Sequence, residues 1–170
     1  MQGPHHKPKM LLMDACVLID YVKAERKLPG LISAHVGPVY VLSVILEEVR
    51  DIKNKDELHN LNLIIIEPEI EDAYLAFEKK SSISFQDRLC LLTAKRNNFI
   101  CVTNDKELRR QCKRNNVEVL WGLQLIAELH KTGGISAESA IKTALTIHHN
   151  NPMQINKKIV TDFIEIISKQ

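Results

Sequence analysis

The chain has 170 residues, of which 45% are hydrophobic and 26% are charged, and its formal net charge is +2 at pH 7. This length suits one domain with a full core, and the composition is that of an ordinary globular protein without low-complexity tracts. No apolar run approaches the roughly 18 residues of a membrane span, so no membrane partner is expected, and the net charge is too small to indicate any partner.

Residues 1–9 contain no apolar core, so they predict a disordered lead rather than a signal peptide. The chain has four cysteines without C-x-x-C spacing: Cys16, Cys90, Cys101 and Cys112. Because each lies in an apolar or helical context, buried free thiols are the simplest interpretation. Free thiols indicate a reducing compartment, which predicts a cytoplasmic protein.

Residues 10–120 alternate short apolar runs with segments of helical periodicity, the pattern of a mainly parallel α/β sheet. Strands are predicted at 10–13, 39–42, 61–66, 99–102 and 117–120. Helices are predicted at 15–27, 31–35, 44–52, 69–80, from Ser84 to the run 95–98, and at 105–115, with an irregular connection at 51–60. The predicted fold is therefore a three-layer α/β/α domain.

Three further helices are predicted after the last strand, at 121–131, 136–149 and 155–168. This extension, residues 121–170, either packs on the same domain or forms a surface for a dimer or another partner. Two predicted helices have a marked apolar side. It consists of Ile70, Ala73, Tyr74 and Phe77 in the helix at 69–80, and of Ala140, Ile141, Ala144 and Leu145 in the helix at 136–149.

Three aspartates stand where a predicted strand or turn gives way to a helix: Asp14, Asp87 and Asp105. Each has a purely structural interpretation, because an aspartate at a helix N-terminus accepts hydrogen bonds from free backbone N–H groups. Asp87 in particular fits a capping box headed by Ser84. Open parallel sheets, however, bind ligands outside the carboxyl ends of their strands, where Asp14 and Asp105 are expected.

A fourth acid is predicted from the phase of the helix that contains it. Ile45, Val49 and Ile52 recur at i, i+4 and i+7. Glu48 lies on that inward face, whereas Glu47 points about a quarter turn away. An inward carboxylate is unfavourable unless it is paired or bound to a metal, so Glu48 is the better candidate. The alternative is a marginal residue whose acid reaches water.

The predicted topology brings four carboxylates to one edge of the sheet: Asp14, Glu48, Asp87 and Asp105. Carboxylates that share a cleft repel one another, and a hard divalent cation relieves that repulsion. Oxygen ligands alone select Mg²⁺ or Mn²⁺ over zinc. Such an ion activates water for attack on a phosphodiester, so the sequence predicts a metal-dependent nuclease.

A stripe of basic residues begins beside Asp105, at i, i+3, i+4, i+7 and i+8 of the predicted helix: Lys106, Arg109, Arg110, Lys113 and Arg114. A charge run of this kind is usually a solvated face. Next to a candidate acidic site it suggests instead a track for an RNA phosphate backbone.

The segments around the four acids resemble the acidic motifs of the PIN-domain ribonucleases over roughly residues 10–120: LLMDACVLIDYV, LSVILEEVRDI, FQDRLCLLTAKRNN and FICVTND. The resemblance implies an α/β/α fold, Mg²⁺- or Mn²⁺-dependent endonucleolytic cleavage of RNA, and frequent homodimers. It also implies that Thr103 and Asn104 support the metal site. Many small bacterial members are VapC-type toxins that an antitoxin protein neutralises, and the extension after Trp121 departs from those shorter toxins.

Three other interpretations of the same residues compete with the nuclease. A catalytically silent PIN-like module that binds RNA or regulates would keep the basic stripe, but it has no reason to retain four acids. A phospho-acceptor signalling domain needs an aspartate closing a central strand, whereas the strand at 61–66 ends in Glu67. Nucleotide-binding enzymes are disfavoured, because neither G-x-G-x-x-G nor a P-loop occurs.

Overall fold

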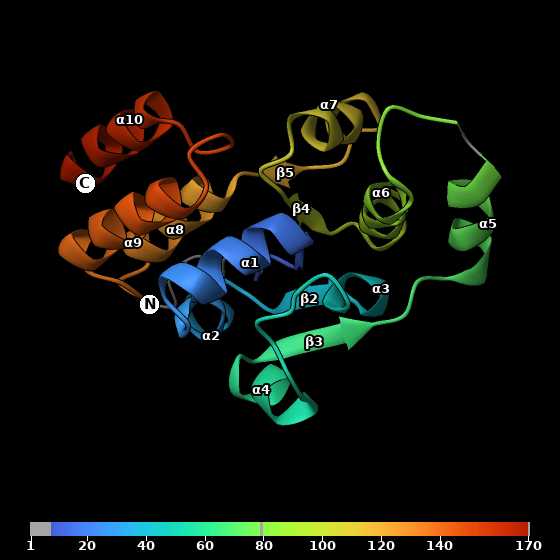
Figure 1. Ribbon diagram of the computed structural model, residues 1–170, viewed down its shortest axis with the longest axis horizontal. Coiled ribbons are helices and arrows are strands. Elements are labelled where there is room, and N and C mark those ends of the chain that lie inside the picture. The colour runs from blue at the N-terminus through green and yellow to red at the C-terminus, as the bar shows by residue number, and fades with distance from the viewer. Residues whose placement is uncertain (1–7, 79, 170) are drawn as a thin grey trace, which may run out of the picture.

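The computed structural model describes residues 8–78 and 80–169. Its centre is a sheet of five parallel strands in the order β3-β2-β1-β4-β5 (Figure 1). The strands are β1 (Leu11–Met13), β2 (Val39–Leu42), β3 (Leu63–Ile66), β4 (Ile100–Val102) and β5 (Val119–Leu120). Every residue of β1 and β4 is buried, as is typical of central strands with helices on both faces. The predicted three-layer α/β/α fold is confirmed.

The strand order reverses between β1 and β4. From β1 the chain adds β2 and then β3 on one side, and it later adds β4 and β5 on the other. Met13 and Val102, the last residues of β1 and β4, are paired in register, and Asp14 N–H donates to the Val102 carbonyl at 2.9 Å. The residues after these two strands therefore meet at the switch point of the sheet, the usual ligand-binding position in this architecture.

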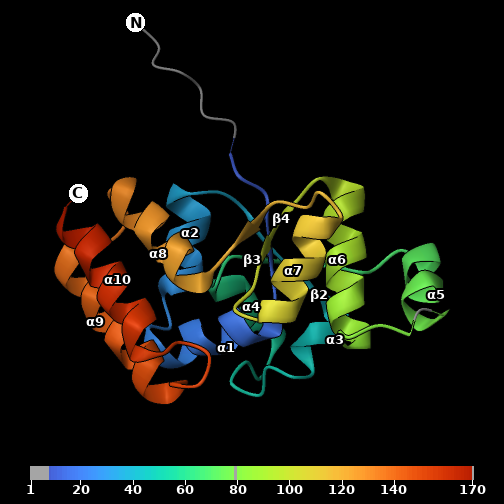
Figure 2. The same ribbon diagram turned by 90° about the horizontal axis from the view of Figure 1, so that it is seen from above.

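Two groups of helices cover the sheet, one on each side, as Figures 1 and 2 show. One group joins the first helices of the chain to the last three: α1 (Ala15–Ala24), α2 (Leu28–His35), α8 (Gly122–Lys131), α9 (Ala137–Asn150) and α10 (Lys157–Ser168). The other group comes from the middle of the chain: α5 (Ile70–Glu78), α6 (Phe85–Asn97) and α7 (Lys106–Arg114). Within the described ranges no helix is both long and apolar enough to cross a membrane.

The last three helices pack onto the α/β domain. Helix α9 contacts α1, and α8 contacts α2. Lys9, at the end of the expected lead, pairs with Glu128 at 2.9 Å, while most of that lead lies outside the described residues. On α9 the expected inward position of Leu145 is wrong: 47% of this residue is exposed, and Ile147 is buried instead.

The connection between β2 and β3 differs from the prediction. The helix expected at 44–52 ends early, as α3 (Ser43–Leu46), and a second helix, α4 (Lys55–Asn60), forms in the segment expected to be irregular. Beyond α3 the chain continues in tight i→i+3 turns, such as Val49 N–H to the Leu46 carbonyl at 3.1 Å. These turns still bury Val49, but they leave both Glu47 and Glu48 exposed, so the predicted inward phase of Glu48 is wrong.

Helices α2 and α5 also depart from their predicted forms. Helix α2 begins at Leu28 rather than at 31, because Pro29 is tolerated in a first turn. Helix α5 turns most of its apolar side to solvent and buries Asp72 instead. The Arg96 guanidinium donates to both carboxylate oxygens of Asp72, at 2.8 and 2.7 Å, and this pair fixes which side of α5 faces α6.

Candidate active site at the switch point of the sheet

Asp14 is the most deeply placed acid at the switch point. It caps α1, and its Oδ1 accepts from Ala15 N–H at 2.7 Å. Its Oδ2 accepts from the Thr103 hydroxyl at 2.9 Å and from the Cys16 thiol at 3.1 Å. Burial raises the pKa of Asp14, the Cys16 hydrogen bond opposes that rise, and the negative charge of Asp87 adds to it. Asp14 therefore bonds two other side chains in addition to capping α1.

Thr103 links Asp14 to Asp105. While its hydroxyl donates to Asp14, the same oxygen accepts from the Asp105 backbone N–H at 3.0 Å. Asp105 caps α7 through Oδ1, which accepts from Leu108 N–H at 2.7 Å. No hydrogen bond within the described residues uses Oδ2 of Asp105. One hydroxyl is thus bonded to both acids.

Asp87 enters the site from the opposite layer. The expected capping box of α6 is present: Asp87 N–H donates to Ser84 Oγ at 3.1 Å, and Ser84 N–H donates to Asp87 Oδ2 at 3.2 Å. The half-buried carboxylate is close enough to Asp14 for its charge to raise the pKa of that acid. Capping and membership of the acidic site are therefore compatible in this residue, because the cap engages only one carboxylate oxygen.

Glu48 lies apart from these three acids. It sits on the exposed turn after α3, and it is not among the groups whose charge raises the pKa of Asp14. Its place in the site stays a prediction.

Asn104 faces away from the acids and holds the base of their loop. It is buried, its side-chain amide donates to Asp20 Oδ2 at 3.1 Å, and its Oδ1 accepts from Gly122 N–H at 3.0 Å. Asn151, far along the chain, donates to Asp20 Oδ1 at 3.2 Å. Burial raises the pKa of Asp20, and the Asn151 and Asn104 amides oppose that rise. The extension after Trp121 is thereby bonded to the loop that carries Thr103 and Asp105.

Motif analysis did not identify two residues that form hydrogen bonds in this region, Cys16 and Asp20. Cys16, two residues after Asp14, touches the site acid. Burial and then the charge of Asp14 raise the pKa of this thiol well above 9.0, so it is a neutral hydrogen-bond donor rather than a nucleophile. Asp20 lies in an otherwise apolar stretch of α1, and a charged residue on a buried helix face is the signal that points to such a network.

The basic stripe of α7 is divided in the structure. Arg109 is half-buried, it donates to the Asn104 carbonyl, and its guanidinium carbon lies 3.6 Å from the centre of the Trp121 ring. Burial lowers its pKa, and the charge of Asp105 opposes this effect. The other four basic residues of the stripe are exposed: Lys106, Arg110, Lys113 and Arg114. Arg110 also pairs with Glu107 at 2.8 Å.

The carboxylate oxygens at the switch point are suitable ligands for a hard divalent cation. Asp14, Asp87 and Asp105 supply only oxygen, which suits Mg²⁺ or Mn²⁺. Within the ranges 8–78 and 80–169 no three histidines, cysteines or acids lie close enough to hold an ion as a cage. Mg²⁺ commonly takes one or two carboxylates and completes its shell with water, so the coupled pair Asp14 and Asp87 satisfies that pattern.

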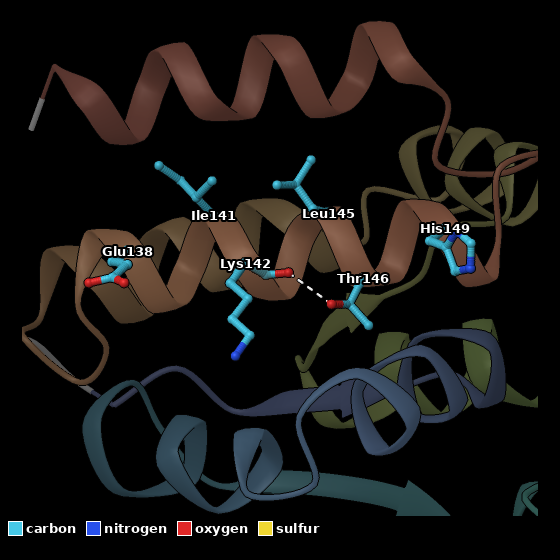
Figure 3. A pocket seen from close by; sticks show the side chains of 6 residues that line it. All are labelled: Glu138, Ile141, Lys142, Leu145, Thr146 and His149. Atoms are coloured by element: carbon cyan, nitrogen blue, oxygen red, sulfur yellow. Dashed lines mark hydrogen bonds between the residues drawn. The ribbon is translucent and has the colours of Figure 1, made fainter.

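A larger depression lies elsewhere, on the outer side of α9. Figure 3 shows this shallow groove of about 530 Å³, which is lined mainly by Ile141, Leu145 and the side chains around them. Ile141 and Leu145 project from one side of the helix, and Lys142 extends from the other. None of the candidate site residues lines it, so it is not the place where the acids act.

Comparison with family models gives one match, described as PIN domain, over residues 11–114. The matched segment runs from the first residue of β1 to the last of α7, so it contains all four candidate acids and the basic stripe. It leaves out β5 and α8–α10. Comparison with curated proteins gives no match.

Proposed function

Because the chain belongs to the PIN-domain family, whose members are in general nucleases, we propose that it is an Mg²⁺- or Mn²⁺-dependent endoribonuclease. The observation that carries the proposal is the link of Asp14 and Asp105 through the Thr103 hydroxyl at the switch point of the sheet, with the charge of Asp87 acting on Asp14. The negative charge of Asp87 disfavours the charged form of the buried Asp14, and a divalent cation removes that penalty. Asp105, aligned with Asp14 through Thr103, is the third acid of the proposed site.

In this proposal the chain positions the ion and the RNA. Asp14 and Asp87 would hold the cation with water completing its shell, and Asp105 and Glu48 are the two further acids predicted for the site. When bound, Mg²⁺ or Mn²⁺ supplies an activated water and stabilises the charge that develops on the phosphate. Thr103 bonds to both Asp14 and Asp105, and Asn104 anchors the loop 103–105 that carries Asp105. The exposed basic side chains of α7 hold the phosphate backbone beside the acids.

The direct test is cleavage of a mixed single-stranded RNA pool with Mn²⁺, with Mg²⁺ and with a chelator. We expect fragments with either metal and none with the chelator. Calorimetric titration of the metal serves as the second readout. If neither cleavage nor metal uptake is observed, the catalytically silent RNA-binding module replaces the nuclease. The exposed position of Glu48 is the observation that favours this second candidate.

The role of the basic stripe has its own test. Replacing Lys113 and Arg114 with glutamate should weaken RNA binding, and it should reduce the slope of log K against log salt by about 1.4, or about 0.7 for each lost phosphate contact on a single strand. The matched control replaces Lys131 and Lys142, two exposed lysines of the C-terminal helices, and makes the same change in net charge. Equal effects of the two double variants would show that the stripe makes no specific contact with RNA and is only a solvated face.

The toxin role, the antitoxin partner and the homodimer that the resemblance implies are predictions of the same proposal. Of these three predictions the toxin role is the least supported, because the C-terminal helices α8–α10 lie outside the matched segment. Mass measurement of the purified chain by light scattering, with and without RNA, checks the homodimer.

A further inference from the structure

The outer side of α5 carries three large apolar side chains that face solvent. Ile70 and Tyr74 are each 65% exposed, and Phe77 is 80% exposed. They recur at i, i+4 and i+7, so they form one stripe along the helix, and Leu75 beside them is 47% exposed. Figures 1 and 2 show α5 as the outermost element of its layer, beyond α6. A contiguous apolar stripe on such a helix indicates a binding surface.

Polar contacts on the inner side of α5 hold this stripe outward. Asp72 is buried and receives two hydrogen bonds from Arg96. Ala76 is buried too, and its carbonyl accepts from Arg88 Nε at 2.5 Å. Turning the stripe inward would break these contacts and leave the Asp72 carboxylate without its partner, which is strongly unfavourable in a buried position. The stripe is therefore a preformed feature of the fold.

The charge around the stripe indicates what binds there. Residues 67–78 contain five acidic side chains and no basic one, and the nearest basic residue that the structure describes after the helix is Lys80. Four of the acids are exposed: Glu67, Glu69, Glu71 and Glu78. Glu71 and Glu78 flank the stripe on the helix and, with Glu69 just before it, form its rim, whereas Glu67 accepts from the Ser43 hydroxyl at the end of β2. A second copy of the chain would place an equally negative rim against this one, and like charges across an interface are unfavourable. An anionic lipid surface is disfavoured for the same reason.

We propose that the outer side of α5 is a docking surface for a basic amphipathic helix of a partner protein. Apolar residues of the partner at helical spacing would cover Ile70, Tyr74 and Phe77, and flanking lysines and arginines would pair with the glutamate rim. This surface is separate from the acids at the switch point and does not depend on the proposed nuclease activity. One short helix offers a small contact area, so the complex is of the weak, transient class.

The test uses a synthetic, fluorescently labelled helical peptide with leucines at i, i+4 and i+7 between lysines and arginines. A second peptide has the same leucines, with glutamate in place of every basic residue. By fluorescence anisotropy we expect the basic peptide to bind the full chain and the acidic peptide not to bind. Replacing Tyr74 and Phe77 with serine should weaken binding at least tenfold. Replacing Leu145 and Met153, which are exposed on the C-terminal helices and the loop between them, should leave binding unchanged.

A second pair of changes tests the rim without altering the apolar stripe. Glu71→Lys with Glu78→Lys should abolish binding of the basic peptide and admit the acidic one. The proposal is overturned if the native chain does not bind the basic peptide, or if the peptide binds the serine double variant as well as the native chain. It is also overturned if light scattering shows a dimer of the native chain that Phe77→Ser converts to monomer, because the occupant would then be a second copy.

Discussion

Asp14→Asn is expected to reduce metal-dependent RNA cleavage by about 10²–10³-fold or more, the scale of losing one charged or hydrogen-bonding group that acts on the transition state. The asparagine amide retains the size of the side chain and its cap of α1, but it has no negative charge for the cation. The measurement is the initial rate of RNA cleavage in Mn²⁺, with the native chain in chelator as the baseline. Undiminished cleavage would remove Asp14 from the site.

The same variant should be as thermally stable as the native chain at pH 7, or more stable. Burial raises the pKa of Asp14 above the 3.8 of the unfolded chain, so folding at neutral pH must desolvate a carboxylate. The folded chain binds this proton more tightly than the unfolded chain, and its stability therefore falls as pH rises from 3.8 through the folded pKa. The asparagine of the variant removes this penalty. Its single oxygen still accepts from Ala15 N–H, and its amide nitrogen, in place of Oδ2, donates to the Thr103 hydroxyl oxygen.

Thermal unfolding of the native chain and of Asp14→Asn, both in chelator, checks this pH dependence of stability. At pH 7 the midpoint of the variant should equal or exceed that of the native chain, and below pH 3.8 any gain should vanish, because the acid is then protonated in both states. A lower midpoint at pH 7 would show that the negative charge of Asp14 stabilises the fold.

Asp20→Ala is expected to destabilise the fold by about 2 kcal/mol. The change leaves the buried Asn104 amide without an acceptor, at about 1–3 kcal/mol, while the half-buried Asn151 amide keeps Gln154 Oε1 at 3.1 Å. The loss is partly offset by removal of a carboxylate whose charged form burial disfavours. The corresponding fall in melting temperature is roughly 4–8 °C. Because Asn104 anchors the loop between Thr103 and Asp105, RNA cleavage should fall as well.

The control for this change is Asn151→Ala, which removes one donor and leaves the acceptor and Asn104 in place. We expect it to cost about 1 kcal/mol, measured like Asp20→Ala by urea unfolding. Equal stability of all three chains would mean that the buried network contributes nothing to the fold. Loss of stability in Asp20→Ala with full RNA cleavage would separate the network from the site.

The features that local sequence predicts well are those decided by neighbouring residues. Short apolar runs predicted all five strands. Asp14, Ser84 and Asp105, each directly before a helix, predicted the N-terminal caps of α1, α6 and α7. Asp14 directly follows β1, and Thr103-Asn104-Asp105 directly follows β4. Because parallel strands bring such residues to the same edge of the sheet, the position of Asp14 and Asp105 there was predictable from topology alone.

The features that sequence did not predict depend on contacts between distant residues. The pair between Asp72 and Arg96 spans 24 positions and overrides the apolar periodicity of α5. The resemblance assigned Asn104 to the support of the metal site, and its bond to Asp20 was not predicted, because Asp20 lies 84 positions earlier on a helix face that is otherwise apolar. The chain after α3 buries Val49 through tight turns instead of a regular helix. The helical spacing that favoured Glu48 over Glu47 therefore does not apply to this segment.

The bond between Asp20 and Asn151 also orders events during translation. The two residues are 131 positions apart, so a ribosome that adds about 5–20 residues per second needs roughly 7–26 s to synthesise the second after the first. Throughout this interval the nascent chain carries Asp14, and in the last third of it also Asp105, but Asp20 lacks its partner Asn151. The network that holds Asn104, the residue before Asp105, is therefore complete only after α9 has been synthesised.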